Sequence, residues 1–401
     1  MRARTRLAAI GTSLALASTA ALAAATPAVA ADDTPTLTVT STQALPALRQ
    51  NPSVEGRDNG QSAGYGGRSV WIFDDTILKN PWGFLSNSGA VTSDLDASDG
   101  IDLLSDNPFT ESSQGRPSQI IPLSPAEQAF QQAHAAPCAT GDEYCGTVYG
   151  FWPGPVAADP AHHRILFTYG KLCRGAPDGT PCQNGFVGTL LGTGFAELDM
   201  LTHKVSRITV ENPDPSITSP EGQDPTLLFP PNNLSFGAGE MVIRGNTLYA
   251  WGACDATTCG VAKVPVDQLQ NRLAWRYYTG ADAHGNPVWG TDPTKATVVG
   301  MVNGPAGGTV QYVPALHGYL NTYMSSYDNV GRYQTAPQPW GPWSAPKAMF
   351  TGLPTNTLWD YASFAHAEYS RRGGLTQYIT YYRPEDEQQE LVRVDFSLQH
   401  S

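Results

Sequence analysis

Carboxylates, glycines and aromatic residues are concentrated in one early stretch of the chain, Arg57–Thr76. Asp58 precedes its glycine-rich part, and Asp74 and Asp75 follow an aromatic run. Two carboxyl groups that flank a glycosidic bond can hydrolyse it, one donating a proton and the other acting as base or nucleophile. Asp58 and Asp75 are our first candidates for that pair. The alternative is that these aspartates only cap turns beside glycine.

Asp74 and Asp75 are expected to point in different directions. Side chains alternate between the two faces of a strand, and the pair comes directly after a strand-like segment. Only one of the two should then face Asp58, and we favour Asp75 for that position. Asp74 is assigned to substrate binding.

Other residues could supply an acid or hold a sugar. Glu240 follows a Gly-rich turn and is an independent candidate for catalysis, the alternative being an exposed charge on a hairpin. Tryptophans beside turns can stack on sugar rings, although most aromatic residues in such chains pack in the core. The predicted substrate-binding residues, besides Asp74, are Trp82, Asn87, Trp152, Trp251, His366 and Glu368.

The composition excludes several classes of protein. The 401 residues carry 24 Lys+Arg against 36 Asp+Glu, a formal net charge of −12, which argues against a nucleic-acid partner. The hydrophobic share of 41% with only 15% charged residues is unlike that of a disordered chain. The 40 glycines and 32 prolines would interrupt the long helices of a bundle.

The first 30 residues are typical of a secretory signal peptide. Arg2, Arg4 and Arg6 precede an apolar, Ala-rich run, and Ala28-Val-Ala30 is a small-residue cleavage site. A retained membrane anchor is the alternative, which the polar residues within the run disfavour. We therefore expect a secreted protein without membrane contact after cleavage, in which residues 31–401 form one domain.

The six cysteines form three pairs that are close in the sequence. Each pair closes a polar, turn-rich loop, and an oxidising destination favours disulfides within the pairs. A zinc site is the alternative, but no Cys-x-x-Cys occurs and no histidine follows at ligand spacing. The predicted disulfides are Cys138–Cys145, Cys173–Cys182 and Cys254–Cys259.

A repeated strand pattern extends over the chain. Each copy has a tight turn at Gly, His or Asn followed by a β-branched and aromatic strand, and four copies have another extended run before the turn. Recurring hairpins with little helical periodicity predict an all-β, five-bladed β-propeller with long loops, a β-sandwich being the alternative. Its ends should meet through Thr36–Thr40 and Leu391–Phe396, and its one short helix should be Pro125–His134, capped by Ser124. The five copies are Gly67–Phe73, His163–Tyr169, Gly245–Trp251, His317–Tyr323 and Gly374–Tyr381. The extended runs before the last four are Pro155–Ala158, Glu240–Ile243, Thr309–Val313 and Phe364–Tyr369.

The early motifs resemble a known family. Arg57-Asp-Asn-Gly60 and Gly66-Gly-Arg-Ser-Val-Trp-Ile-Phe-Asp-Asp-Thr76 are similar to the opening motif of the domain-of-unknown-function 4185 family, which includes the endo-D-arabinanases of glycoside hydrolase family 183. Phe151–Pro155, Trp340–Pro346 and His366-Ala-Glu368 add to the resemblance. Asp74 and Asn59 stand where the family motif has glycine. The resemblance implies a five-bladed propeller that hydrolyses a furanoside polymer with Asp58 and Asp75.

A more distant resemblance concerns the five-bladed furanosidases of glycoside hydrolase family 43. In that family a first-blade aspartate serves as base and a third-blade glutamate as acid. The resemblance therefore points to Glu240 as an alternative acid.

The sequence thus predicts a secreted, monomeric glycoside hydrolase that acts on a polysaccharide or oligosaccharide, with D-arabinan as the candidate substrate. A non-catalytic, lectin-like propeller that binds glycans is the alternative. The chemistry requires no cofactor, and no metal-binding or nucleotide-binding motif is present. The acidity is compatible with a structural Ca²⁺, although no loop has the ligand series of an EF-hand.

Overall fold

The computed structural model describes residues 36–104, 115–136, 146–175, 182, 187–232, 234–252, 254, 258–325, 328–356 and 359–399. Within them lie 27 strands, a single α-helix and several short 3₁₀ turns, so the predicted all-β class is confirmed. The predicted signal peptide and the Cys138–Cys145 pair lie outside the described residues. No helix in the described ranges is long and apolar enough to cross a membrane.

The first two of five main sheets come from the N-terminal half of the chain. All their pairs are antiparallel, and neighbouring strands mostly follow one another in the sequence. The first sheet consists of β3 (Gln61–Tyr65), β4 (Arg68–Phe73) and β7 (Ser88–Thr92), and the second of β8 (Thr147–Asp159), β9 (Arg164–Gly175), β10 (Thr189–Asp199), β11 (Lys204–Arg207) and β14 (Leu227–Phe229). Beside them are two small sheets, one of β2 (Val54–Arg57), β5 (Thr76–Leu78) and β6 (Gly83–Leu85), the other of β12 (Thr218–Ser219) and β13 (Gly222–Gln223).

The remaining three sheets repeat this arrangement. The third consists of β15 (Met241–Arg244), β16 (Thr247–Gly252), β17 (Cys259–Pro265), β18 (Arg276–Ala281), β19 (Pro287–Gly290) and β20 (Val298–Met301). The fourth consists of β21 (Gly308–Val313), β22 (Gly318–Met324), β23 (Val330–Ala336) and β24 (Lys347–Thr351). The fifth consists of β25 (Tyr361–Ala365), β26 (Thr376–Arg383), β27 (Gln388–Gln399) and β1 (Thr36–Leu45).

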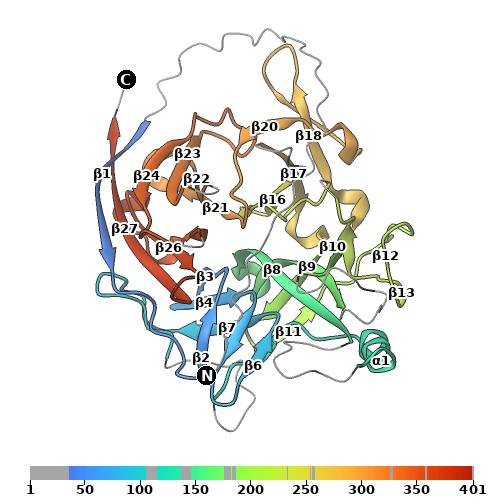
Figure 1. The fold of residues 1–401 in the computed structure, drawn as a ribbon. Helices are drawn as coiled ribbons and strands as arrows, with labels where there is room; N and C mark the ends of the chain where they lie inside the picture. The colour runs from blue at the N-terminus through green and yellow to red at the C-terminus, as the bar shows by residue number, and fades with distance from the viewer. Residues whose placement is uncertain are drawn as a thin grey trace.

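The first strands of these sheets lie next to one another in chain order (Figure 1). β3 contacts β8, β8 contacts β15, β15 contacts β21, and β21 contacts β25. The 3₁₀ turn η6 (Ala367–Tyr369), which follows β25, returns to contact β3. The fifth sheet therefore lies beside the first.

Strand β1 joins the two ends of the chain. It pairs antiparallel with β27, with Leu37 opposite Leu398 and Leu45 opposite Leu391. β27 alternates between buried and partly buried residues, whereas in β1 only Leu37 is buried. The predicted meeting of the first and last strands is confirmed.

The predicted turns and strands are observed at all five repeats. His163 and His317 adopt left-handed backbone conformations with φ of 53° and 52° at the turns before β9 and β22. One extended run was assigned wrongly: Phe364–Tyr369 is not continuous strand, because β25 ends at Ala365 and η6 begins at Ala367.

The single helix and two disulfides also agree with the predictions. Helix α1 (Pro125–Ala133) begins after Ser124, whose hydroxyl accepts from the backbone N–H of Glu127 while the Glu127 carboxylate accepts from the backbone N–H of Ser124. The disulfides Cys173–Cys182 and Cys254–Cys259 are formed.

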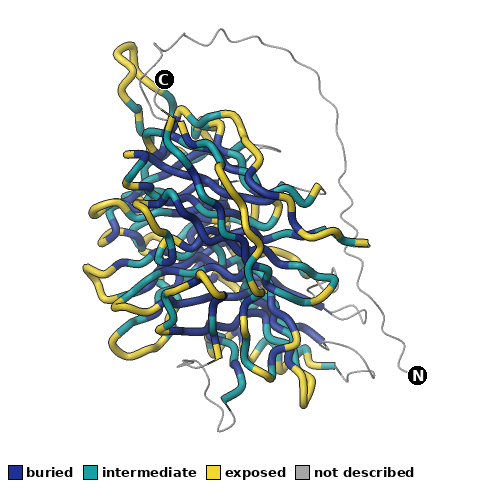
Figure 2. The backbone as a smooth tube through the Cα atoms, turned by 90° about the vertical axis from the view of Figure 1, so that its left-hand side faces the viewer, coloured by how far each residue is buried: buried dark blue, intermediate teal, exposed yellow. Residues whose placement is uncertain are grey.

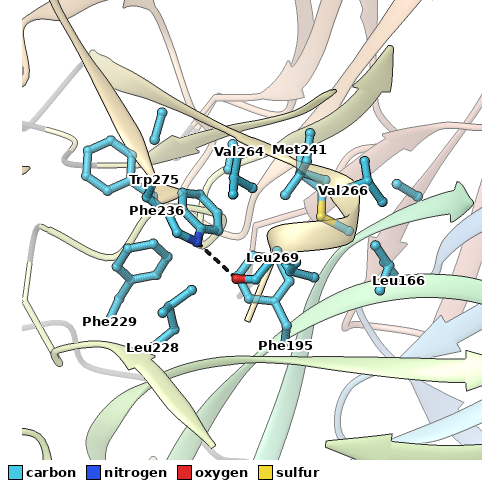
Figure 3. Close-up of a cluster of buried hydrophobic side chains, with 14 of the residues drawn as sticks. Leu166, Phe195, Leu228, Phe229, Phe236, Met241, Val264, Val266, Leu269 and Trp275 are labelled. Atoms are coloured by element: carbon cyan, nitrogen blue, oxygen red, sulfur yellow. Dashed lines mark hydrogen bonds between the residues drawn. The ribbon is translucent and has the colours of Figure 1, made fainter. Parts of the chain in front are cut away.

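Buried apolar side chains fill the spaces between the sheets. The tube in Figure 2 is buried along the middle of the strands and exposed mainly at the connections. Figure 3 shows the cluster between the second and third sheets, where Phe195, Phe229 and Trp275 pack together and the Trp275 indole N–H donates to the Leu269 carbonyl at 3.0 Å. This packing fixes the sheets relative to one another.

Candidate active site

Hydrogen bonds connect neighbouring sheets around the candidate site. The Asn59 side-chain amide donates to the Pro153 carbonyl at 3.1 Å, linking the first sheet to the second. Other such links are Thr168 Oγ1 to the Gly237 carbonyl at 2.8 Å, the Ala365 N–H to Thr309 Oγ1 at 3.1 Å, and the Tyr361 hydroxyl to Asp58 Oδ2 at 2.8 Å. The hydrogen bonds of Asn59 and Tyr361 hold Pro153 and Asp58, which are far apart in the sequence from their partners, at the candidate site.

Asp58, Asp74 and Asp75 form one cluster, which we call the aspartate cluster. The Asp58 N–H donates to the Asp75 carbonyl at 3.2 Å, and the Asp74 N–H donates to the Asp58 carbonyl at 3.1 Å. The Asp58 and Asp75 charges raise the pKa of Asp74, and the Asp75 charge raises the pKa of Asp58. All three carboxyl groups therefore lie within electrostatic range of one another.

Asp74 and Asp75 do not lie on a strand, so side-chain alternation does not decide which of them faces Asp58. Strand β4 ends at Phe73 and β5 begins at Thr76, so the two aspartates occupy a bend between strands. Side-chain alternation applies only to extended strand backbone. Both carboxyl groups interact electrostatically within the cluster, Asp74 with Asn59 as its hydrogen-bond partner and Asp75 with Trp152.

Asp75 has the environment that best stabilises a carboxylate. Its Oδ1 accepts from the Trp152 indole N–H at 2.9 Å and from Arg174 Nη2 at 3.0 Å, and its Oδ2 accepts from the same Nη2 at 3.1 Å. Burial raises the pKa of Asp75, and the Arg174 charge and the Trp152 hydrogen bond oppose that rise. Asp75 is therefore the member of the cluster most easily kept ionised.

Asp58 is balanced between its two protonation states. Burial, and next the charge of Asp75, raise its pKa to about 7, while the hydrogen bond from Tyr361 lowers it. Its Oδ1 is buried and has no hydrogen-bond partner. A carboxyl group with this pKa can give or take a proton near neutral pH.

Asp74 is the member most strongly biased toward the protonated form. Burial and then the charges of Asp58 and Asp75 raise its pKa well above the usual range, against a hydrogen bond from Asn59 Nδ2 at 2.7 Å. Asn59 adopts a left-handed conformation with φ of 58°, which explains how it can stand where glycine was expected. Three neighbouring carboxyl groups thus have graded proton affinities, the pattern of acid–base catalytic sites.

Glu240 is the candidate for catalysis at the start of the third sheet. It precedes β15 and is only 2% exposed, so the alternative of an exposed hairpin charge is wrong. Burial raises its pKa, the backbone N–H groups of Gly308 and Val310 oppose that rise, and no carboxylate contributes. Its Oε1 has no hydrogen-bond partner.

Within the described part of the chain, three predicted substrate-binding residues form no hydrogen bond with the aspartate cluster. Trp82 is 54% exposed at the turn between β5 and β6, the end of that hairpin remote from Asp75. Asn87 is buried, where its amide donates to the Phe151 carbonyl and accepts from the N–H groups of Ile120 and Ile121. Trp251 is fully buried between the third and fourth sheets. The assignments of Asn87 and Trp251 are wrong because both side chains are enclosed by protein.

His366 and Glu368 belong to a separate network between the first and fifth sheets. Ser62 Oγ is 2.7 Å from His366 Nδ1 and donates to Glu368 Oε1 at 2.5 Å, and Thr380 Oγ1 is 2.8 Å from His366 Nε2. His366 is fully buried, and burial lowers its pKa to about 3. The predicted contact of His366 with sugar is therefore wrong, and Glu368 likewise bonds to protein side chains.

Two residues of the site were missed by sequence reasoning. Tyr361 comes from β25 and Arg174 from β9, far from Asp58 and Asp75 in the sequence. Neither lies in a recognisable motif. Trp152, in contrast, was predicted from its place beside Pro153-Gly154 in the second sheet, and its indole contacts Asp75.

One cluster in the described ranges has the composition of a metal site. Glu127, Glu221 and Asp224 place carboxylate oxygens within 4.8 Å of one another. The buried Lys171 ammonium lies 2.6 Å from oxygens of Glu127 and Glu221 and 2.7 Å from one of Asp224. The lysine thus fills the centre of the cluster and neutralises part of its charge.

Comparisons with known proteins find similarity in structure. A candidate hydrolase from Bacteroides ovatus has a TM-score of 0.48 at 16% identity, covering 87% of this chain and 87% of that one. The catalytic domain of a family 62 α-L-arabinofuranosidase from Coprinopsis cinerea has a TM-score of 0.43 at 12% identity, covering 90% and 98% of the two chains. A family 43 enzyme from Xanthomonas citri, solved with xylose, has a TM-score of 0.42 at 10% identity, covering 86% and 88%.

No protein-family model and no curated protein sequence matches the chain. At these TM-scores and identities, the structural similarities do not assign an activity to it.

Proposed function

We propose that this protein is a secreted glycoside hydrolase whose aspartate cluster cleaves furanosidic linkages in a polysaccharide. The observation that supports this function is the joint position of Asp58, Asp74 and Asp75, three interacting carboxyl groups with different proton affinities. Hydrolysis of a glycosidic bond needs one carboxyl group that is protonated and another that is ionised. Asp58, with its raised pKa of about 7, is the candidate for the protonated group, and Asp75, paired with Arg174, is the candidate for the ionised one.

The proposed architecture is a closed, five-bladed β-propeller made of the five main sheets. Three features support it: the contacts between successive first strands, the return of η6 to β3, and the pairing of β1 with β27. In such a fold, the starts of the inner strands surround one end of the central axis. Asp58, directly before β3, is then placed where a glycan could bind.

In the proposed mechanism, Asp58 is the general acid. Its pKa of about 7 leaves a protonated fraction at neutral pH, and the proton passes to the glycosidic oxygen as the bond to the anomeric carbon breaks. The leaving sugar departs as an alcohol. Tyr361 holds Asp58 Oδ2 and thereby limits its movement.

Asp75 is the proposed base or nucleophile. Arg174 and Trp152 keep its carboxylate ionised, so that it can take a proton from the attacking water or itself attack the anomeric carbon. Either course adds one water across the bond. Asp74, held by Asn59, is assigned to binding a sugar hydroxyl.

The substrate class and location are also proposals. D-Arabinan is favoured by the resemblance of the Arg57–Thr76 motif, and secretion is supported by the two disulfides in the described residues. A polysaccharide outside the cell is accessible to such a protein.

A screen of glycans tests this function. The mature protein is incubated with D-arabinan, L-arabinan and other cell-wall polysaccharides, and the released oligosaccharides are measured by mass spectrometry. We expect release from a furanose polymer by the unmodified chain and none by the Asp58→Asn/Asp75→Asn double variant. The exposed Asp267→Asn is the matched control and should retain activity. Binding without cleavage by the unmodified chain would instead establish a lectin-like propeller.

A further inference from the structure

A second group of aromatic side chains lies between the third and fourth sheets. We call Tyr249, Tyr278, Trp289 and Trp340 the aromatic patch. The Trp289 ring centroid is 5.7 Å from that of Trp340 and 5.6 Å from that of Tyr278, and Tyr249 lies 6.2 Å from Trp340. All four side chains are partly exposed, unlike the fully buried Trp251 in the adjacent core.

Two cations border the aromatic patch. The Lys263 ammonium lies 4.1 Å from the Trp289 ring centroid, and the Arg244 guanidinium lies 3.9 Å from that of Tyr312. Neither cation forms an ion pair within the described part of the chain, whereas Arg164 and Arg207 each pair with carboxylates. Burial lowers the pKa of Lys263, and no carboxylate opposes that effect. The patch is therefore positively charged on a protein that is acidic as a whole.

Polar atoms of the aromatic patch remain available to a ligand. In the described residues, the indole N–H groups of Trp289 and Trp340 and the hydroxyls of Tyr249 and Tyr278 form no hydrogen bond, and none is a buried atom. The neighbouring Trp343 differs, because its indole donates to the Pro339 carbonyl. Aromatic faces together with accessible donors suit the alternating apolar and hydroxyl surfaces of a sugar ring.

The aromatic patch is separate from the aspartate cluster. Arg244 is the last residue of β15 and Glu240 precedes its first, so the patch begins roughly 13 Å along the strand from the end where the sheets are linked. Tyr249 lies opposite Val242 and Lys263 in the third sheet. Trp340 lies in the connection that follows Ala336, the last residue of β23, which pairs with Tyr319. The aromatic patch therefore belongs to the third and fourth sheets, whereas the aspartate cluster lies beside the first sheet.

We infer that the aromatic patch binds a segment of a polysaccharide that carries carboxylate groups. Sugar rings stack on Trp289 and Trp340, their hydroxyls accept from the free donors, and their carboxylates pair with Lys263 and Arg244. The inference goes beyond the proposed hydrolysis and does not require it, since binding here needs no reaction.

Binding measurements test the inference. The probe is polygalacturonate, with debranched arabinan as the neutral polysaccharide, and affinity is measured by calorimetry on the Asp58→Asn/Asp75→Asn background so that cleavage cannot interfere. We expect Trp289→Ala and Lys263→Ala each to weaken polygalacturonate binding at least about tenfold, and added salt to weaken it further. Two exposed residues of the second sheet provide the controls, Leu201→Ala and Lys204→Ala, which should bind normally.

The outcomes separate this inference from the proposed hydrolysis. If the background protein and its Trp289→Ala variant bind polygalacturonate with equal affinity, the aromatic patch is not the binding site. This conclusion would hold even if the unmodified chain cleaves arabinan. Unchanged affinity of the Lys263→Ala variant for polygalacturonate would overturn the role of that cation. Binding that is lost in both patch variants, while thermal unfolding stays unchanged, would support the inference.

Discussion

The Tyr361 hydroxyl donates a 2.8 Å hydrogen bond to Asp58 Oδ2, and this contact joins the fifth sheet to the first. The two residues are 303 positions apart in the sequence, so their contact depends on the packing of the fifth sheet beside the first. The same hydrogen bond stabilises the ionised form of Asp58. The contact between the fifth-sheet strand β25 and Asp58 thus affects the proton affinity of the proposed acid.

Tyr361→Phe should raise the pKa of Asp58, because the hydrogen bond that it removes favours the ionised carboxylate. The general acid must be protonated, so the alkaline limb of the kcat/KM profile should move to higher pH, by about one unit. The pH dependence of kcat/KM measures this shift. Tyr65→Phe in the first sheet is the control, since Tyr65 contacts His163 instead. An alkaline limb that stays in place would contradict the assignment of Asp58 as the acid.

Trp152→Phe should shift the acidic limb of the kcat/KM profile. The substitution keeps an aromatic ring but removes the N–H that donates to Asp75 Oδ1, so the pKa of Asp75 should rise. Because the base or nucleophile must be ionised, the acidic limb should move to higher pH and kcat at neutral pH should fall about tenfold. A variant with an unchanged acidic limb would show that Asp75 is not the group titrated there.

The sequence was informative where local chemistry decides the structure. Turn residues such as His163 and Gly245 located the hairpins, and alternation in Thr36–Thr40 and Leu391–Phe396 identified the strands that close the chain. The cysteine pairs in the described residues follow from short loops in an oxidising environment. These features depend on residues close in sequence or on a simple period.

The features that the sequence did not predict depend on contacts between residues that are distant in the sequence. Alternation could not orient Asp74 because a bend replaces the strand there. A position beside a turn did not make Trp251 accessible, because the next sheet covers its side chain. Tyr361 and Arg174 could not be found, since only the packing of the sheets places them at Asp58 and Asp75. Contacts between two sheets leave no pattern in the sequence of either strand alone.

Asp360→Asn should stabilise the protein at alkaline pH. Both carboxylate oxygens of Asp360 are buried without hydrogen-bond partners, and burial raises its pKa from 3.8 to about 7. The folded state therefore holds a proton that the unfolded state loses, so stability falls as the pH rises from about 4 to 7. The variant has no carboxyl group at position 360, so its stability does not fall in this way. Its Tm should exceed that of the unmodified chain by an amount that grows between pH 4 and pH 8. An advantage independent of pH would contradict this account.

Lys171→Met should strongly destabilise the fold. The ammonium lies among Glu127, Glu221 and Asp224, and its removal would leave buried carboxylates without their cation. The loss of unfolding free energy should be about 3–5 kcal/mol, measured in urea. The exposed Lys204→Met should change it by less than about 0.5 kcal/mol. A similar stability for both variants would show that Arg207 alone neutralises the cluster.

The proposed chemistry of Asp58 and Asp75 is tested most directly by kcat/KM of the single variants Asp58→Asn and Asp75→Asn on the best-cleaved glycan, with Tm measured on the same samples. We predict that each substitution lowers kcat/KM by about 10²–10⁴-fold while the variant stays folded at the assay temperature, because amides can neither donate a proton nor act as base. Asp75→Asn should also lower Tm, since it removes the carboxylate that pairs with the buried Arg174. If either folded variant retains activity within about tenfold of the unmodified chain, that aspartate is not catalytic and the central proposal is wrong.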